Sequence, residues 1–514
     1  MTISTAGGNR IALAAVCLAS LMFGLEISSV PTILPTLEKV LPADFQQLQW
    51  IMNAYTIAVT TVLMATGTLA DRYGRKRIFV GSILVFGAAS LVCGLADSAV
   101  ILILSRCLQG MSGGAMLICQ VAVLSHQFRE GPERSHAFAA WGIIFGIGLG
   151  FGPIIGATIV AISNWQWVFL VHVVVAIVAV GLAVTGVRES RDPDAKHLDI
   201  AGVVTLSASV FCVAFYITQG SDLGFSSPAG LGVIATAILS FVAFVLAETC
   251  SARPMFAFSV FRVRTFSGAL LGSMGMNFSF WPFMIYLPIY FRSGLGYGNV
   301  AAGAALLAYT LPTLVIPPLG ERMLLRFGAR TAIPTGLFVI GLGFMLMWVG
   351  NNVEHASWLT LLPGCLLAGI GLGLTNTTVT NTTTGSVSST RAGMASGIDM
   401  SARMISLAIN IALMGFILIA GISAWLRNAV PGVFDPARLQ VLAQRIAGGN
   451  IALSDLPELH SLPSPDAAVH AALVHGFGLV ALYGGISVWI LSLLSFLIFG
   501  KKASCAGLPL ASEV

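Results

Sequence analysis

Two carboxylates and two arginines stand inside long apolar segments of this 514-residue chain, where ionisable side chains are costly. Glu26 lies in the first apolar segment and has no basic residue within one helical turn. Asp399 is followed four residues later by Arg403, a spacing that predicts an ion pair on one helix face. Arg106 lies well inside another apolar segment. Because a buried carboxylate can alternate between protonated and charged forms, this pattern predicts proton exchange within a membrane.

Each acid also allows a structural interpretation. Glu26 can accept a hydrogen bond from a serine and help two helices to pack. A pair between Asp399 and Arg403 would keep the carboxylate ionised, so coupling and structural neutralisation are equally supported for this acid. The candidate proton-coupling residues, the favoured one first, are Glu26, Arg106, Asp399 and Arg403.

A short cationic turn separates the second and third apolar segments. Its glycines, acid and bases are Gly67, Asp71, Arg72, Gly74, Arg75, Lys76 and Arg77. Three consecutive cations cannot cross a bilayer, so they place the turn on the cytoplasmic side. Gly67 permits close backbone approach, Gly74 permits a turn, and Asp71 can cap a helix or pair with an arginine. A loop that served topology alone would explain the cations but not the glycines and the acid.

The fifth apolar segment has small residues at intervals of four around a proline. They are Gly148, Gly152, Pro153 and Gly156. This spacing builds a smooth face for close helix packing in membranes. Pro153 removes one backbone hydrogen bond and predicts a kink. Taken alone, the pattern is equally compatible with an ordinary packing face.

Composition excludes a soluble globular protein. Hydrophobic residues make up 56% of the chain and charged residues 9%, whereas soluble domains carry about 25% charged residues. The mean hydropathy is +0.90. A net charge of +5 does not indicate nucleic-acid binding, because the cations are spread over short loops. The eight cysteines lie mostly in apolar segments without metal-ligand spacing, so neither a metal site nor a disulfide framework is predicted.

Fourteen apolar segments are long enough to span a hydrocarbon core of about 30 Å. Their ranges are 11–34, 47–69, 78–96, 99–122, 136–161, 166–187, 200–219, 229–248, 268–291, 300–320, 331–350, 357–376, 392–422 and 472–499. The polar stretch 375–390 can continue the twelfth helix or form a loop. With both termini in the cytoplasm, nineteen of the 26 Lys and Arg residues lie inside, which supports this topology.

Together these motifs resemble the major facilitator superfamily of secondary transporters. The cationic turn is similar to the superfamily's motif between helices 2 and 3. The fifth segment is similar to the helix 5 motif of the exporting, antiport branch, with Ala157 in place of a final glycine. Arg106, with Gln109 and Gly110, resembles the helix 4 motif, which implies a proton-coupling role for Arg106. Glu26 stands at the acidic position of helix 1, where aspartate is more usual.

Further stretches narrow the resemblance to the fourteen-helix drug/proton antiporter family. They are 49–55, 164–169 and 392–397, with Arg403 beyond the last of them. Gln166 and His172 depart from this pattern, since arginine and asparagine are usual at these positions. The implied fold is an all-α polytopic membrane protein with fourteen transmembrane helices, in two six-helix bundles plus two inserted helices.

The expected domains are an N-terminal six-helix bundle at 1–190, two inserted helices with a linker at 191–265, and a C-terminal six-helix bundle at 266–514 with a long outer loop at about 423–470. A weak echo of the cationic turn at 320–330 supports two parallel repeats, with the binding site at their interface. The acid of the first turn is replaced by Leu325 in the second.

The resemblance implies proton-coupled efflux of drugs or toxic small molecules by alternating access. No cofactor is expected, because the proton gradient supplies energy and the sequence holds no phosphate loop. The glycines, acid and first two arginines of the turn form the cytoplasmic gate. Candidate substrate-cavity residues are Tyr55, Gln109, Trp281 and Tyr286. The aromatic residues at 278–286, His172 and His475 can line a cavity, but lipid-facing packing is expected for most members of this set.

The expected partners are lipophilic small molecules, cationic ones included, protons and the lipid bilayer. The outer loop either meets a periplasmic adaptor or is a solvated connector. The expected location is the cytoplasmic (inner) membrane, crossed many times, with both termini in the cytoplasm. One alternative is a dedicated exporter of one metabolite, lipid or siderophore, and another is a proton/solute uptake symporter, which the Gly152-Pro153 motif disfavours. A membrane enzyme is disfavoured because no nucleophile, metal cluster or cofactor motif is recognisable.

Overall fold

The computed structural model describes residues 5–41, 45–129, 131–192, 199–224, 226–250, 258–353, 356–388, 391–429, 436–448 and 465–500, and these ranges contain helices and connections but no strand. The first eight helices are α1 (Thr5–Val40), α2 (Phe45–Tyr73), α3 (Arg75–Gly94), α4 (Ala99–Gln127), α5 (Gly131–Ile162), α6 (Gln166–Gly186), α7 (Ile200–Leu223) and α8 (Pro228–Cys250). The later elements are η1 (Phe258–Arg262), α9 (Arg264–Asn277), α10 (Phe280–Ile289), the π-helix η2 (Tyr290–Gly294), α11 (Asn299–Thr310), α12 (Pro312–Val315), α13 (Pro317–Phe327), α14 (Ala329–Asn351), α15 (Trp358–Gly385), α16 (Ala392–Ala429), α17 (Pro436–Gly448) and α18 (Pro465–Phe499).

The long apolar helices confirm a polytopic membrane fold. Within the described residues, twelve helices are long and apolar enough to cross a membrane, and a bent pair formed by α11–α12 and α13 raises the number to thirteen. The segment expected at 268–291 is divided between α9 and α10, with a break after Asn277. The count of fourteen is therefore approximate, because two of the expected spans are not single straight helices.

The polar stretch that follows the twelfth apolar segment continues as helix, since α15 runs to Gly385. Most of its threonine hydroxyls donate to carbonyl oxygens of the same helix. Thr378 donates to the carbonyl of Leu374 at 2.8 Å, and Thr382 donates to the carbonyl of Thr378 at 2.6 Å. Because most of these hydroxyls bond one turn back, the polar composition does not interrupt the helix.

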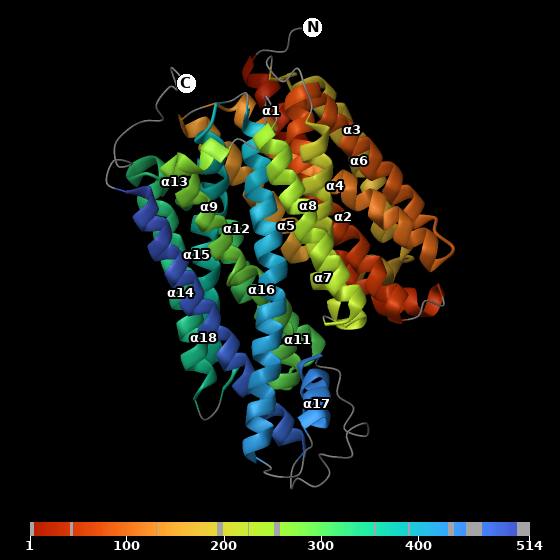
Figure 1. Cartoon of the computed structure of the whole chain (residues 1–514), viewed down its shortest axis with the longest axis vertical. Coiled ribbons are helices and arrows are strands. Elements are labelled where there is room, and N and C mark those ends of the chain that lie inside the picture. Colours follow the sequence, from red (N-terminus) through yellow and green to blue (C-terminus); the bar gives the residue numbers. More distant parts are fainter. Residues whose placement is uncertain are drawn as a thin grey trace.

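The helices gather into two halves with a helix pair between them (Figure 1). In the N-terminal half, α1 packs against α5 and α6, α4 against α2 and α3, and α3 against α6. In the C-terminal half, α14 packs against α15 and α18, and α9 and α16 also contact α18. The paired helices α7 and α8 join the two halves, because α7 contacts both α2 and α16. The domain boundaries at residues 190 and 265 stay predictions.

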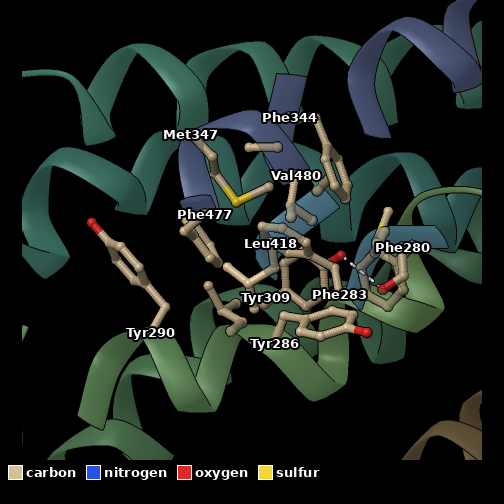
Figure 2. Close-up of a cluster of buried hydrophobic side chains, with 14 of the residues drawn as sticks. Phe280, Phe283, Tyr286, Tyr290, Tyr309, Phe344, Met347, Leu418, Phe477 and Val480 are labelled. Carbon is tan, nitrogen blue, oxygen red and sulfur yellow. Dashed lines mark hydrogen bonds between the residues drawn. The ribbon is translucent and has the colours of Figure 1, made fainter. Parts of the chain in front are cut away.

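An aromatic core holds the C-terminal half together (Figure 2). Phe280 of α10 stacks on Tyr309 of α11 with ring centroids 4.0 Å apart. Phe283 contacts Phe344 of α14 at 4.7 Å and Phe477 of α18 at 4.8 Å. The expectation that most aromatic residues of this segment face lipid is thus wrong, because α10 turns its rings into the bundle.

The predicted outer loop at 423–470 is largely helical where the structure describes it. α16 continues to Ala429, α17 occupies 436–448, and α18 begins at Pro465, while 430–435 and 449–464 lie outside the described residues. At about 1.5 Å per residue, the 38 residues of α16 far exceed a membrane core of about 30 Å. Apolar residues of α17 are buried in the core of the C-terminal half, which fixes this short helix against the bundle.

Candidate functional site

A buried ion pair between α1 and α4 forms the polar centre of the N-terminal half. Nη1 of Arg106 pairs with Oε1 of Glu26, and neither side chain is more than 1% exposed. The same Nη1 donates to Oε1 of Gln109 at 2.8 Å, and Nε of Arg106 donates to the carbonyl of Ile51 at 3.1 Å. The guanidinium lies 4.3 Å from the centre of the Tyr55 ring. One carboxylate and one aromatic face thus compensate a cation that has lost its water.

The tertiary packing changes how Glu26 is understood. No base lies near it along α1, as its sequence indicates, but α4 brings Arg106 to it from 80 positions away. A buried pair is stable only while both charges are present, because removal of one leaves the other uncompensated. Protonation of Glu26 would therefore free Arg106 to rearrange, which is the chemistry that proton coupling requires.

His172 of α6 completes the polar centre. Its Nδ1 lies 3.5 Å from Oε2 of Glu26, and the residue is 1% exposed. This histidine belongs to the bundle interior and does not face lipid, because α6 packs between α1 and α3 and turns the imidazole inward.

A second buried network joins α9, α15 and α16 in the C-terminal half. Arg403 lies 3.4 Å from Asp399, in the ion pair that their spacing predicts. Ser273 donates to Oδ1 of Asp399, and Thr380 donates to Oδ2 at 3.3 Å. Arg403 also donates to Oδ1 of Asn376 at 2.6 Å and to the hydroxyl of Thr380 at 2.8 Å. The carboxylate thus has two hydroxyl donors and one arginine partner, which come from three different helices.

The cationic turn makes a contact between the two halves that we call the Asp71 latch. Asp71 of α2 accepts hydrogen bonds from the backbone N–H groups of Gly393 (3.2 Å) and Met394 (3.0 Å), at the start of α16. Arg75 donates to the same carboxylate at 2.8 and 3.0 Å. A helix N-terminus carries unpaired N–H groups and a positive dipole end, so it is well suited to bind a carboxylate.

Glycines bring the backbones of the Asp71 latch together. A Cβ atom on Gly67 would lie 2.6 Å from the carbonyl oxygen of Gly393. The backbones of α2 and α16 can therefore approach this closely only because residue 67 has no side chain. Gly74 has φ +113°, and a Cβ atom on it would meet the carboxylate of Glu189. Arg72, by contrast, lies over the ring of Tyr73 at 5.1 Å on the outer side of the turn.

A second contact between the halves, the Arg134 latch, was not expected from the sequence. Arg134 near the start of α5 donates to the side chain and backbone of Asn381 and, at 2.8 Å, to the hydroxyl of Thr384, both on α15. Nδ2 of Asn381 donates to Oε2 of Glu321 on α13 at 2.7 Å. Arg134 and Glu321 are 5% and 2% exposed. These hydrogen bonds therefore join α5 of the N-terminal half to α15 and α13 of the C-terminal half.

The small residues of α5 pack against α1. A Cβ atom on Gly148 would lie 2.9 Å from the carbonyl oxygen of Leu21, and one on Gly152 would collide with the hydroxyl of Ser28. Gly156 is buried, and α5 continues through Pro153 as one helix. The pattern thus positions α1, the helix that carries the acid of the polar centre.

The four candidate substrate-cavity residues do not form one cluster. Tyr55 and Gln109 belong to the polar centre of the N-terminal half. Tyr286 donates from its hydroxyl to the carbonyl of Ile411 at 2.6 Å, and Trp281 packs edge-on against Phe280 in the C-terminal half. Figure 2 shows Tyr286 at the edge of the aromatic core. A role in substrate binding stays a prediction for all four.

Comparison with known proteins agrees with this architecture. The family model of the Major Facilitator Superfamily matches residues 16–411. The chain belongs to this superfamily.

Two bacterial relatives of this superfamily transporter carry resistance names. The chain is 29% identical to the multidrug resistance protein Stp of Mycobacterium tuberculosis (strain CDC 1551 / Oshkosh), over 85% of this chain and 81% of Stp. It is 27% identical to the tetracenomycin C resistance and export protein of Streptomyces glaucescens, over 96% of this chain and 91% of that protein. Its fold is similar to the major facilitator proton:xylose symporter XylE bound to 6-bromo-6-deoxy-D-glucose, with a TM-score of 0.59, 13% identity and 96% of each chain covered.

Membership of the superfamily makes the chain a multi-pass membrane transporter and not an enzyme. Across the described ranges, no group of three or more His, Cys, Asp or Glu side chains is placed to hold a metal ion. The buried acids Glu26, Asp71 and Asp399 are instead each paired with an arginine.

Sequence reasoning missed several residues of the site. It placed two acids well inside the spans and Asp71 in the gate, but it did not identify Glu321, which is buried at 2% exposure. Glu321 lies in the weak echo of the cationic turn, so the repeat was the signal that could have found it. Arg134 and Asn381 carry no such signal, because their importance depends on the packing of α5 against α15.

Proposed function

We propose that this major facilitator transporter exports drugs or other toxic lipophilic molecules, cationic ones included, in exchange for protons. The resistance names of relatives that align over most of the chain support the substrate class. The observation that carries the coupling is the buried pair of Glu26 and Arg106. Burial of a charged carboxylate costs little free energy while its arginine partner is present and much when the partner is absent. A change in its protonation can therefore drive a movement of the helices that carry the pair.

In the proposed cycle, the side chain of Glu26 either binds a proton or forms an ion pair with a cation. With the proton absent, it pairs with Arg106 or with a cationic substrate. When the proton arrives from outside, the carboxyl group becomes neutral and the positive partner is released. A pH difference of one unit supplies about 1.4 kcal/mol per proton, and each 100 mV of membrane potential adds about 2.3 kcal/mol. No bound cofactor is needed.

The two latches support alternating access. The Asp71 latch and the Arg134 latch both join the N-terminal half to the C-terminal half at the end that carries the cationic turn. Both are formed here, so the end that carries the cationic turn, which we assign to the cytoplasm, is held closed. Opening toward the cytoplasm requires both to break, because each spans the two halves that must separate.

The location and orientation that we propose are the cytoplasmic membrane with both termini inside. Gln127 at the end of α4 donates to Asn9 of α1 and to the carbonyl of Gly186 at the end of α6. Lys76 of the cationic turn donates to the carbonyl of Val184, also near the end of α6. The start of α1 therefore lies on the side of the cationic turn, which the positive-inside rule assigns to the cytoplasm.

A dedicated exporter of one metabolite, lipid or siderophore would use the same coupling residues and differ only in its cavity. An uptake symporter shares the fold, as the likeness to XylE illustrates. Export is favoured by the tight α1–α5 packing at Gly148 and Gly152, the motif typical of the antiport branch. The extension formed by α16 and α17 suits a periplasmic adaptor as well as a solvated connector.

The test is Glu26→Gln in reconstituted vesicles with an imposed pH gradient. Glutamine keeps the size of the side chain but cannot exchange a proton, so substrate transport should fall to the background of empty vesicles. Glu133→Gln, which neutralises an exposed acid on α5, is the matched control and should transport normally. Gradient-driven transport at the wild-type rate in Glu26→Gln would move the coupling role to Asp399. Expression in an efflux-deficient host against a broad compound panel would identify the substrates.

A further inference from the structure

His172 holds both ring nitrogens opposite backbone carbonyl oxygens. Nδ1 lies 3.1 Å from the carbonyl oxygen of Val168, and Nε2 lies 3.2 Å from that of Met22 on α1. A carbonyl oxygen can only accept, and a neutral imidazole has a single N–H group. In either neutral tautomer, one ring nitrogen would therefore set its lone pair against an oxygen. The doubly protonated ring donates to both carbonyls, so this geometry fits the imidazolium.

Glu26 provides the negative charge that a buried imidazolium needs. Its Oε2 lies 3.5 Å from Nδ1 of His172 and accepts no hydrogen bond, while its Oε1 is held by Arg106. A buried carboxylate oxygen without a donor carries a desolvation cost. A small movement of either side chain would turn the N–H of Nδ1 toward Oε2 and remove this cost.

The elements around α6 leave Glu26 as the natural proton partner. α3 presents Phe86, whose ring meets the imidazole edge-on with centroids 5.8 Å apart. Arg106 of α4 lies beyond the carboxylate, and Tyr55 of α2 and Cys93 of α3 are the other titratable groups near that arginine. Among the described residues, Glu26 is the one acid within ion-pair distance of the ring.

We propose that His172 is a proton relay for Glu26. A proton passes from Nδ1 of the imidazolium to Oε2 of the carboxylate, so an N–H bond breaks, an O–H bond forms, and the total charge of the polar centre is unchanged. Arg106 then loses its counter-charge and is free to move, and the neutral ring accepts the next proton from water on the side that is open. This inference rests on the proposed proton-coupled export, because a relay has no task in an uncoupled carrier.

The experiment compares His172→Asn and His172→Gln with wild type in vesicles. Two rates are measured: transport driven by a pH gradient across a range of pH, and counterflow of substrate without a gradient. A positioned proton-transfer group contributes about 100-fold or more to a rate, so gradient-driven transport should fall by about that factor. Counterflow should persist, because it exchanges substrate without proton movement. His136→Asn, which removes an exposed histidine of α5, is the control.

An unchanged gradient-driven rate and pH profile would refute the relay, and equal loss of both rates would assign His172 a structural role instead. Failure of the proposed function itself looks different, since Glu26→Gln would then retain coupling.

Discussion

Replacement of Asp71 by asparagine should shift the transporter toward the state that is open to the cytoplasm. The carboxylate accepts two hydrogen bonds from the start of α16, at Gly393 and Met394, and two from Arg75 of its own half. When the halves separate at this end, the bonds to α16 are lost, whereas those to Arg75 can remain. The two hydrogen bonds from α16 therefore stabilise only the closed state.

The size of the shift follows from the bonds that asparagine cannot make. The amide keeps one acceptor oxygen, so one backbone bond is lost and the other becomes neutral. A hydrogen bond to a charged group contributes about 1.5–3 kcal/mol and a neutral one about 0.5–1.5 kcal/mol, and an anion at a helix start adds about 0.3–1 kcal/mol. The closed state should lose about 3–5 kcal/mol, which changes the ratio of the two states by about 100- to 4,000-fold.

Distances between spin labels at the exposed positions Tyr73 and Arg391, on the two sides of the Asp71 latch, would measure this ratio. Asp71→Asn should lengthen the distance distribution and change turnover more than substrate affinity. Asp97→Asn, at an exposed acid after α3, should leave both unchanged. An unaltered distribution together with an unaltered turnover number in Asp71→Asn would show that the turn serves topology alone.

Three further predictions test the other contacts. Gly148→Ala should lower the free energy of unfolding by about 1–3 kcal/mol, because its Cβ atom would press on the α1 backbone. Gly150→Ala on the same helix is the control, since its Cβ atom would meet nothing within 4 Å. Equal melting temperatures of the two variants would contradict this packing. Arg403→Ala should cost about 3–5 kcal/mol of stability and added Asp399→Asn should restore part of it; additive losses, with the pH response of transport abolished in Asp399→Asn alone, would favour proton coupling. Arg134→Gln should populate the cytoplasm-open state in the same label experiment, and an unchanged distribution there would mean that its contacts with α15 do not hold the halves together.

Much of the fold could be predicted from the sequence because membrane helices are specified locally. Apolar segments long enough to span a bilayer predicted the helices. Hydropathy alone treats two of these spans as continuous, but one breaks at Phe278–Ser279 and the other is divided where α12 and α13 begin at Pro312 and Pro317. The polar threonine stretch could be interpreted in two ways, since its continuation as helix depends on hydroxyl bonds to the preceding turn. The outer helix α17 was missed because its apolar face is short and gains stability only against the bundle.

The sequence by itself determined the membrane class, the transporter resemblance and contacts within one helix, such as the pair of Asp399 and Arg403. These features depend on hydropathy, motif and the 3.6-residue period, all of which act over a few turns. Only the tertiary structure decided that Glu26 pairs with Arg106, and that Asp71 binds the start of a helix 322 positions further along the chain. The reason is physical: a buried charge takes whichever partner the packing of helix faces brings within reach, and that packing is a property of the whole bundle.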